Sequence, residues 1–309
     1  MSETRIITVN EESQGIRLDK FLNCYFEDLS RSGLQKLIEE GFVTINGQAR
    51  KSNYKLKGDE YVTVSIPAPV EPEIEPEDIP IDVVYEDDDL IIVNKPKNMV
   101  VHPANGHYTG TLVNALLYHC KDNLSVINGV KRPGIVHRID MDTTGLLAVC
   151  KNDISHNALA EQLKDHTVNR TYHAIVKGCL YEDGTVDAPI GRNKSDRKKM
   201  AVIRDGSGKE AITHYHVIET FKNYTYIQCN LETGRTHQIR VHMAYINHPI
   251  LGDLVYGHKD SRFPGTLTQT LHAKELELIH PSKGEKVRFT TDLPDYFQNI
   301  LRIIKTNNY

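Results

Sequence analysis

The sequence contains no apolar run of the length that a signal peptide or a membrane span requires. The N-terminus reads Met-Ser-Glu-Thr-Arg-Ile-Ile-Thr, and no later stretch approaches the roughly 20 apolar residues of a transmembrane helix. With 39% hydrophobic and 25% charged residues, the composition is that of an ordinary globular protein, and 309 residues suffice for two domains. We therefore expect a cytoplasmic protein that does not associate with membranes.

Cysteine is scarce, and its spacing suggests no pairing. The five cysteines, at positions 24, 120, 150, 179 and 229, form no Cys-x-x-Cys pair, so neither a disulfide framework nor a zinc site is indicated. The 15 histidines are numerous but lack the His-Glu-x-x-His spacing of a zinc-binding helix. We expect reduced thiols and no bound metal.

The chain lacks the positive net charge that is common in nucleic-acid-binding proteins, because its formal net charge is −4. However, ten acidic residues lie within residues 71–89, a segment without Lys or Arg; taking these ten from the 41 acidic residues leaves 31, against 37 basic residues. The densest basic run, residues 192–199, has five positive charges and one negative. Such a run is typical of a solvated surface loop or of a loop that contacts phosphates.

Residues 1–66 show the pattern of a small RNA-binding module. A short helix is predicted from Arg17, a second helix ends at Gly41, and Asn46-Gly47 predicts a hairpin turn. Residues 30–38 and 41–47 resemble the S4 RNA-binding domain. The resemblance implies RNA binding, with these candidate phosphate contacts: Arg31, Lys36, Arg50 and Lys51.

Residues 67–80 are predicted to be a Pro/Glu-rich linker, because frequent proline blocks helix and sheet while the acidic residues repel one another. In residues 81–309, many short β-rich runs alternate with polar turns, and helical patterns occur at 111–118, 155–166 and 238–245. This order predicts an α+β fold with a mixed, largely antiparallel sheet.

The most informative stretch surrounds Asp140 and reads Val-His-Arg-Ile-Asp-Met-Asp-Thr-Thr-Gly. Asp140 lies between two apolar segments, and His137, Arg138 and Asp142 crowd around it, as is typical of a carboxylate tuned for a function. From these residues alone three interpretations stay open. They are a carboxylate nucleophile, a turn bonded to its own backbone, and the Asp140-x-Asp142-x-Thr144 signature of Mg-dependent phosphohydrolases of the haloacid dehalogenase type.

Three further segments carry a family resemblance: Asn-Lys-Pro-Lys-Asn-Met-Val-Val-His-Pro at 94–103, Arg-Thr-Tyr-His-Ala-Ile-Val-Lys-Gly at 170–178, and Leu-Glu-Thr-Gly-Arg-Thr-His-Gln-Ile-Arg-Val-His at 231–242. Together with residues 137–147 they resemble the pseudouridine synthases of the RluA superfamily, most closely the RluD type, which joins an S4 domain to the catalytic domain. The resemblance spans nearly the whole chain, and it implies a pseudouridine synthase catalytic domain at residues 81–309.

The resemblance implies roles for individual residues. Asp140 matches the catalytic aspartate that attacks a flipped uridine, Tyr172 matches the tyrosine that contacts the uracil ring, and Arg240 matches the basic residue that pairs with the aspartate. Arg138 matches the residue that takes the place of the extruded base. Further contacts in the cleft or with RNA are expected from four residues: Arg235, His237, Lys95 and His102.

The implied reaction isomerises specific uridines in large-subunit (23S) ribosomal RNA, free or in a pre-ribosomal particle, and we expect a monomeric enzyme. The N1–C1′ bond breaks, the uracil turns, and C5 joins C1′ without redox change or hydrolysis, so no cofactor is expected. Asp140 has three routes: addition to C1′, addition to C6 of the ring, or abstraction of a sugar proton. The alternatives are the same chemistry on tRNA or another rRNA site, a Mg-dependent phosphohydrolase, and a ribosome-binding factor that has lost catalysis.

Overall fold

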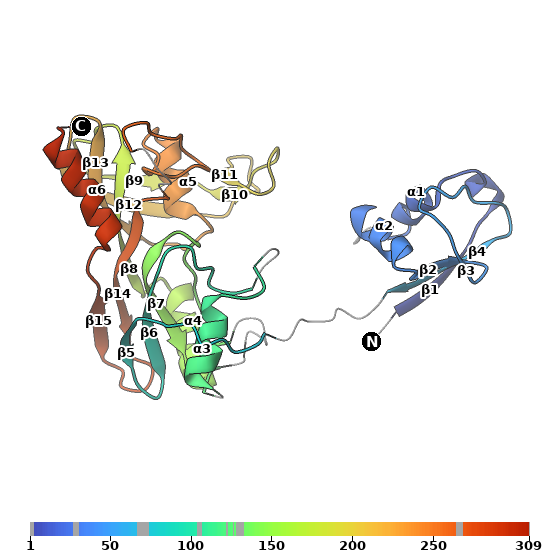
Figure 1. The fold of residues 1–309 in the computed structure, drawn as a ribbon, viewed down its shortest axis with the longest axis horizontal. Coiled ribbons are helices and arrows are strands. Elements are labelled where there is room, and N and C mark those ends of the chain that lie inside the picture. The colour runs from blue at the N-terminus through green and yellow to red at the C-terminus, as the bar shows by residue number, and fades with distance from the viewer. Residues whose placement is uncertain are drawn as a thin grey trace. The chain divides into compact units, whose positions relative to one another are not determined.

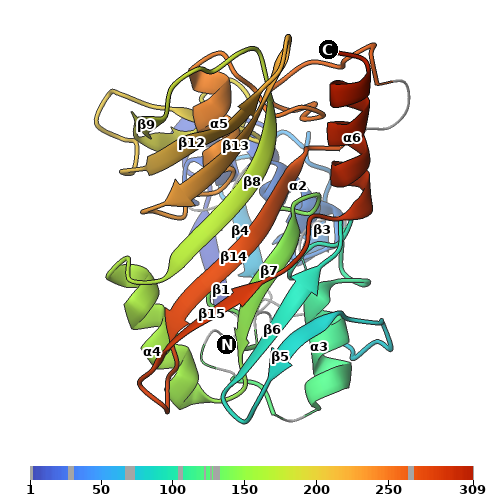
Figure 2. The same cartoon turned by 90° about the vertical axis from the view of Figure 1, so that its left-hand side faces the viewer.

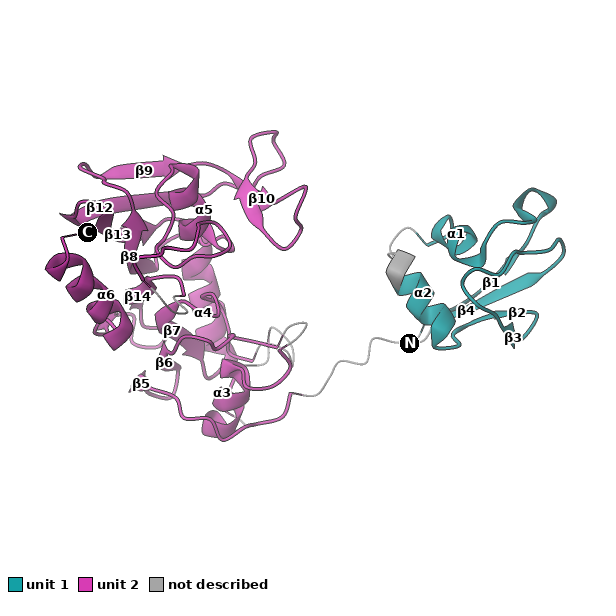
Figure 3. Ribbon diagram, turned by 45° about the horizontal axis from the view of Figure 1, so that its top comes forward, with its two compact units in different colours: residues 1–72 teal, residues 73–309 magenta. Residues whose placement is uncertain are grey.

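The computed structural model describes residues 3–26, 31–66, 74–103, 107–121, 123–125, 127, 133–263 and 268–308, with the backbone alone at residues 3, 31 and 32. The chain divides into two compact units, Met1–Pro72 and Glu73–Tyr309, which are coloured separately in Figure 3. Helices and strands are labelled in Figure 1.

The described residues of the smaller unit form a four-stranded antiparallel sheet in the order β1-β4-β2-β3 and two helices. Its elements are β1 (Glu3–Thr8), the 3₁₀ turn η1 (Glu11–Ser13), α1 (Leu18–Asn23), α2 (Arg31–Glu39), β2 (Val43–Ile45), β3 (Gln48–Ala49) and β4 (Tyr61–Ile66). Leu22, Leu34 and Val62 are fully buried in its own core. Asn46 and Gly47 have φ angles of 48° and 78°, as a tight two-residue hairpin requires. The predicted helices and hairpin are confirmed.

The larger unit is built on one long sheet in the order β5-β6-β7-β14-β8-β13-β12-β9, with β15 paired to β14. Its strands are β5 (Val83–Glu86), β6 (Leu90–Lys95), β7 (Thr144–Cys150), β8 (Asn169–Lys177), β9 (Gly184–Asp187), β12 (Ile212–Thr220), β13 (Tyr224–Leu231), β14 (Leu271–Ile279) and β15 (Lys286–Thr290). Figure 2 shows β8, β14 and β7 side by side at its centre. Among the described strands of this sheet, only the β7–β14 pair is parallel, so the largely antiparallel prediction is confirmed.

The described residues of this unit also form four helices and one hairpin: α3 (Leu112–Cys120), α4 (Asp153–Lys164), α5 (Gln238–Tyr245), α6 (Asp295–Thr306) and the ribbon β10 (Ile190–Arg192) with β11 (Met200–Val202). Successive residues of β6 point to opposite faces of the sheet. Ile91 packs with Leu116 of α3 and Ile239 of α5, whereas Ile92 packs with Leu159 of α4. Both faces of the sheet are therefore covered.

Helix α6 is absent from the sequence predictions. Its residues Phe297, Ile300 and Ile304 are buried against Ile175 and Tyr224 of the sheet. Their spacing of three and four residues is that of an amphipathic helix, whose partner face becomes visible only once the sheet is formed.

The predicted linker at 67–80 lies partly outside the described residues, at 67–73. Its remaining part, residues 74–80, has neither helix nor strand but is held on the larger unit. The N–H of Glu77 donates to the carbonyl of Asn114 (3.0 Å), and Nδ2 of Asn114 donates to the carbonyl of Glu75 (2.8 Å). Ile74 and Ile79 pack against the core beneath. This part of the segment is anchored rather than free.

Gly145 allows β7 and β14 to approach closely just after the Asp140 loop. It has a φ of 108°, and a Cβ at this position would lie 2.2 Å from the carbonyl oxygen of Ala273. Any other residue would therefore both strain the backbone and collide with β14. This contact fixes the point at which the Asp140 loop enters the sheet.

Candidate active site

A pocket of about 460 Å³, a usual size for a small-ligand site, lies beside β8. It is lined by the Asp140 loop, the end of α4, β8 and the segment that leads into α5. Among the described lining residues, Asp140 is the sole carboxylate. The basic lining residues are Arg138, Lys164, Arg170, Arg235 and Arg240, accompanied by His137, His166 and His237. Such a pocket favours a negatively charged substrate.

The loop that carries Asp140 is bound to the sheet by hydrogen bonds before and after the aspartate. The N–H of Ala148 donates to Nε2 of His137 (2.9 Å), and Nε2 of Gln269 donates to the hydroxyl of Thr143 (2.7 Å). The N–H of Thr143 donates to the carbonyl of Asp140 (3.1 Å). These bonds fix the backbone of the loop on which the carboxylate is carried, as a catalytic group requires.

Lys95 does not face the pocket. It is 1% exposed, and its Nζ donates to the carbonyls of Pro96 (2.7 Å), Met99 (2.8 Å) and Met141 (2.9 Å). All three N–H groups of the ammonium are therefore used inside the protein. The prediction that Lys95 lines the outer cleft and contacts RNA is wrong, and the lysine instead ties β6 to the Asp140 loop.

Arg240, in the first turn of α5, joins Asp140 to a second carboxylate. Its Nη1 donates to Oδ2 of Asp140 (2.9 Å), while Nε and Nη2 donate to the two oxygens of Asp253 (2.7 and 3.0 Å). Burial by itself would lower the pKa of Arg240, but the hydrogen bonds to Asp253 and the charges of both carboxylates raise it well above its usual range. Arg240 is therefore a permanent cation beside Asp140.

Asp253 holds the Arg240 guanidinium in place through its two hydrogen bonds. Its side chain is fully buried, and it also accepts from the N–H groups of Val255 (2.9 Å) and Tyr256 (3.1 Å). Burial would raise the pKa of Asp253, but the Arg240 guanidinium lowers it below its usual value. The carboxylate thus stays ionised and fixes the plane of the guanidinium.

His237 lies on the other side of Asp140. Its Nε2 is 3.7 Å from Oδ1 of Asp140, and its Nδ1 is 2.7 Å from the hydroxyl of Tyr256. Burial lowers the pKa of His237, although the Asp140 charge partly opposes this effect. Since the imidazole is then neutral at pH 7, Arg240 is the charged partner of Asp140.

Tyr172 and Arg170 point into the pocket from the same face of β8, two residues apart. Tyr172 is 6% exposed, and burial is the main reason that its pKa is raised. The Arg170 charge lowers this pKa and the Asp140 charge raises it, so both groups act on the Tyr172 hydroxyl. Tyr172 therefore lies within electrostatic range of both charges.

The remaining predicted RNA contacts of this unit divide into two groups. Arg138 is exposed and lines the pocket. Arg235 is half-buried and also lines the pocket, and its Nε donates to the carbonyl of Glu210 (2.8 Å). His102 is half-buried and does not belong to the pocket lining.

In the smaller unit, the side chain of Arg31 lies outside the described residues. Lys36, Arg50 and Lys51 are exposed. Nζ of Lys36 is 3.6 Å from Oε1 of Glu40, and the Arg50 guanidinium lies over the ring of Tyr54. Exposed positions of this kind remain available to phosphates.

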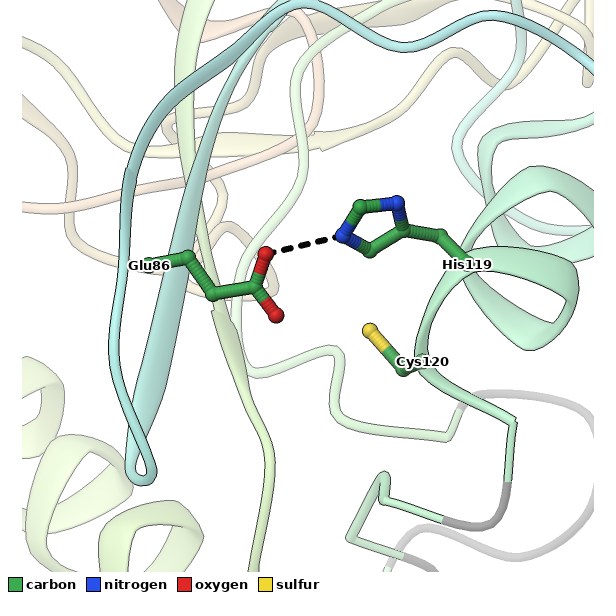
Figure 4. A group of neighbouring side chains, drawn as sticks. All are labelled: Glu86, His119 and Cys120. Atoms are coloured by element: carbon green, nitrogen blue, oxygen red, sulfur yellow. Dashed lines mark hydrogen bonds and ion pairs between the residues drawn. The ribbon is translucent and has the colours of Figure 1, made fainter.

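Two groups of potential metal ligands occur among the described residues, and neither includes Asp140. One is Asp87, Asp89 and His280; the other is Glu86, His119 and Cys120, which converge in Figure 4. In the second group Glu86 already pairs with His119 (2.8 Å) and Lys151 (2.9 Å). Burial raises the pKa of Cys120 to about 11, and a metal would need the thiolate.

The Mg-dependent phosphohydrolase interpretation is not supported. It needs a doubly wound parallel sheet, whereas the observed sheet is largely antiparallel. Asp142 does not line the pocket with Asp140, and the Thr144 hydroxyl is engaged by Nδ1 of His272 (2.8 Å).

Sequence reasoning missed several lining or supporting residues: Arg170, Lys164, His166, Asp253 and Tyr256. A signal for Asp253 exists in principle, because a buried arginine normally requires more than one acceptor group. No such signal exists for Lys164 and His166, since only the tertiary fold brings the end of α4 beside β8.

Comparison with known proteins agrees with this geometry. Residues 89–245 match the family described as RNA pseudouridylate synthase, and residues 16–62 match the S4 domain. An uncharacterised RNA pseudouridine synthase of Bacillus subtilis (strain 168), YlyB, is 51% identical over 97% of this chain and 98% of the relative. A ribosomal large subunit pseudouridine synthase D of Zymomonas mobilis is 48% identical over 99% of each chain.

A solved structure shares the fold. The human RNA pseudouridylate synthase domain containing 1 superposes with a TM-score of 0.56 at 24% identity, over 76% of this chain and 98% of that chain. In the part of the chain that the structure describes, no helix combines the length and apolar character needed to cross a membrane.

Proposed function

The chain belongs to the RNA pseudouridylate synthase family, and we propose that it isomerises specific uridines of large-subunit ribosomal RNA to pseudouridine, with Asp140 as the catalytic group. The observation that carries this proposal is the Asp140–Arg240 pair inside a pocket whose other charges are positive. The choice of substrate is supported by the Zymomonas mobilis relative, which is named for the large ribosomal subunit and matches over the full length.

In the proposed reaction the target uridine leaves its stack, at a cost of a few kcal/mol, and enters the pocket. Arg138 is exposed at the pocket and occupies the gap that the base leaves. Val136, Leu231 and Leu271 supply apolar walls that limit access of water to the detached ring. Tyr172 lies against the uracil.

Asp140 acts on the nucleotide held in this way. Arg240 keeps the carboxylate ionised and aimed, because Asp253 prevents the guanidinium from turning. All three routes, through C1′, C6 or the sugar proton, use the carboxylate of Asp140. The net change is an isomerisation, so the residues of the chain supply all the groups used.

RNA binding extends beyond the pocket in this proposal. The β10–β11 ribbon exposes Arg192, Lys194, Arg197 and Lys198, and the smaller unit exposes Lys36, Arg50 and Lys51. These side chains neutralise phosphates and give affinity without reading the base sequence. We propose that the enzyme acts as a monomer, because one chain supplies the described pocket, and that it works in the cytoplasm, where ribosomal RNA is found.

The test is base-resolution pseudouridine mapping of ribosomal RNA and tRNA from cells that lack the gene. We expect defined large-subunit sites to disappear and to return with the wild-type gene but not with Asp140→Asn. Loss of tRNA sites alone would replace the substrate proposal with its tRNA alternative. Unchanged maps would contradict the proposed function.

A further inference from the structure

Arg170 is a buried cation without a partner among the residues that the structure describes. It is 8% exposed, its guanidinium forms no hydrogen bond or ion pair with any described residue, and its Nε is enclosed. Arg240, by contrast, is bound by two carboxylates in the same pocket. An unpaired buried charge costs several kcal/mol of desolvation free energy, so a structural role does not account for Arg170.

The surroundings of Arg170 hold its guanidinium at the pocket wall. A Cβ at Gly234 would lie 2.5 Å from Nη1 of Arg170, so the guanidinium occupies the space that a side chain at 234 would take. His137 lines the same pocket as Arg170. Burial and then the Arg170 charge lower the pKa of His137 to about 3. The neutral His137 accepts from Ala148 at Nε2 and therefore carries its proton on Nδ1, which is also unpartnered.

The Arg170 guanidinium thus lines the same pocket as Tyr172 without an acceptor among the described residues. We propose that Arg170 is a catalytic residue, and that its guanidinium binds the uracil oxygen on which negative charge builds when the uridine reacts. This inference rests on the proposed function and deepens it. It is independent of the route that Asp140 takes.

The charge balance explains the need for such a group. When C1′–N1 breaks, the electron pair leaves with the uracil and spreads over N1, O2 and O4, while C1′ bonds to Asp140 or C2′ gives a proton to it. If Asp140 instead adds to C6, the charge appears first on O4. In each case C1′ finally bonds to C5, the bond from Asp140 to C1′ or C6 breaks or Asp140 returns its proton to C2′, the C5 proton is lost and N1 gains a proton. A guanidinium in a water-poor pocket stabilises this transient anion.

The test uses the full-length protein and an RNA fragment that the wild type converts. Arg170→Met should lower the single-turnover rate at saturating RNA by about 10²-fold, the usual effect of removing one such donor, and change the RNA Kd by less than about threefold. Arg170→Lys keeps the charge but loses the planar guanidinium, so its single-turnover rate should lie between those of the wild type and Arg170→Met. Arg302→Met, an exposed arginine on α6, controls for lost positive charge and should match the wild type.

A substrate with 5-fluorouridine at the target position adds a chemical readout. Fluorine stabilises negative charge on the ring, so the penalty of Arg170→Met, measured as consumption of the target nucleotide, should shrink severalfold. If Arg170 instead binds a phosphate of the target, Kd should rise while the saturated rate and the fluorine effect stay unchanged, and the proposal is overturned. Inactivity of the wild type on every RNA would refute the proposed function itself, not this inference alone.

Two further measurements separate catalysis from folding. Removing an unpaired buried charge should leave the melting temperature of Arg170→Met at or above that of the wild type, and a large drop would indicate a structural role. Gly234→Ala should displace the Arg170 guanidinium without removing it. It should therefore lower the single-turnover rate when introduced into the wild type, but should not lower the rate further when introduced into Arg170→Met. Additive losses in the double variant would contradict the proposal.

Discussion

Nη1 of Arg240 donates to Oδ2 of Asp140 across 2.9 Å, joining residues 100 positions apart in the chain. The other side of the same guanidinium is fixed by Asp253. The Asp140 carboxylate is therefore oriented through a second carboxylate that is buried outside the pocket lining.

Asp140→Asn should abolish isomerisation, because an amide is neither a nucleophile nor a base, while RNA affinity should stay within about tenfold, since Asp140 contacts no phosphate. Rate and affinity are measured separately by single-turnover assay and filter binding. Asp142→Asn is the matched control: it lies two residues away, outside the pocket lining, and should retain activity. If Asp142→Asn lost isomerisation activity and Asp140→Asn kept it, Asp142 rather than Asp140 would be the catalytic aspartate.

Asp253→Asn should destabilise the protein by about 3 kcal/mol at pH 7, because the buried Arg240 loses its main partner. The pKa of Asp253 is lowered in the folded state, so its contribution is fully present above the unfolded value of about 4 and is lost as the pH falls through the folded value. The difference between the urea midpoints of wild type and variant should therefore begin to shrink as the pH falls below about 4 and should vanish only below the folded pKa of Asp253. Asp292→Asn, a fully exposed carboxylate, should show neither effect. A difference between the two urea midpoints that does not change with pH would contradict this role for the Asp253 charge.

Lys95→Met should cost about 2–4 kcal/mol of unfolding free energy, because three carbonyls lose their donor inside the protein. It should also reduce the rate at saturating RNA, since the Met141 carbonyl supports the Asp140 loop. RNA affinity should be unchanged, because the ammonium faces no solvent. A variant that is fully stable and loses only RNA affinity would restore the RNA-contact role.

Removing residues 1–72 should leave a folded larger unit that converts a short RNA at saturation but binds long RNA more weakly, with a shallower salt dependence of Kd. Removing residues 1–80 should further lower the free energy of unfolding by about 2 kcal/mol, because Ile74 and Ile79 no longer cover the core. Urea unfolding of the two shortened chains makes the comparison. Equal stabilities would show that residues 74–80 are a passive spacer.

Much of this arrangement could be predicted where the signal is local. The 238–245 pattern gave the bounds of α5, and Asn46-Gly47 gave the hairpin, because periodicity and turn chemistry act over a few residues. The pairing of Asp140 with Arg240 came from the family resemblance, and the structure brings the two together. Their catalytic roles remain a prediction.

Other features depend on contacts that no short segment reveals. The sequence around Lys95 predicts an exposed lysine, because its hydrogen bond to the Met141 carbonyl joins residues 46 positions apart. Arg170 reads as an ordinary strand residue, and its burial depends on a loop at Gly234. Helix α6 needs the sheet face on which it packs.

We propose that Asp140 isomerises uridine in ribosomal RNA. The most direct measurement is base-resolution pseudouridine mapping of transcribed large-subunit RNA fragments after incubation with purified wild-type protein or Asp140→Asn, in monovalent salt with a chelator. We predict pseudouridine at defined positions with the wild type and none with the variant. Equal yields from both proteins, or no pseudouridine from the wild type on any fragment, would contradict the account.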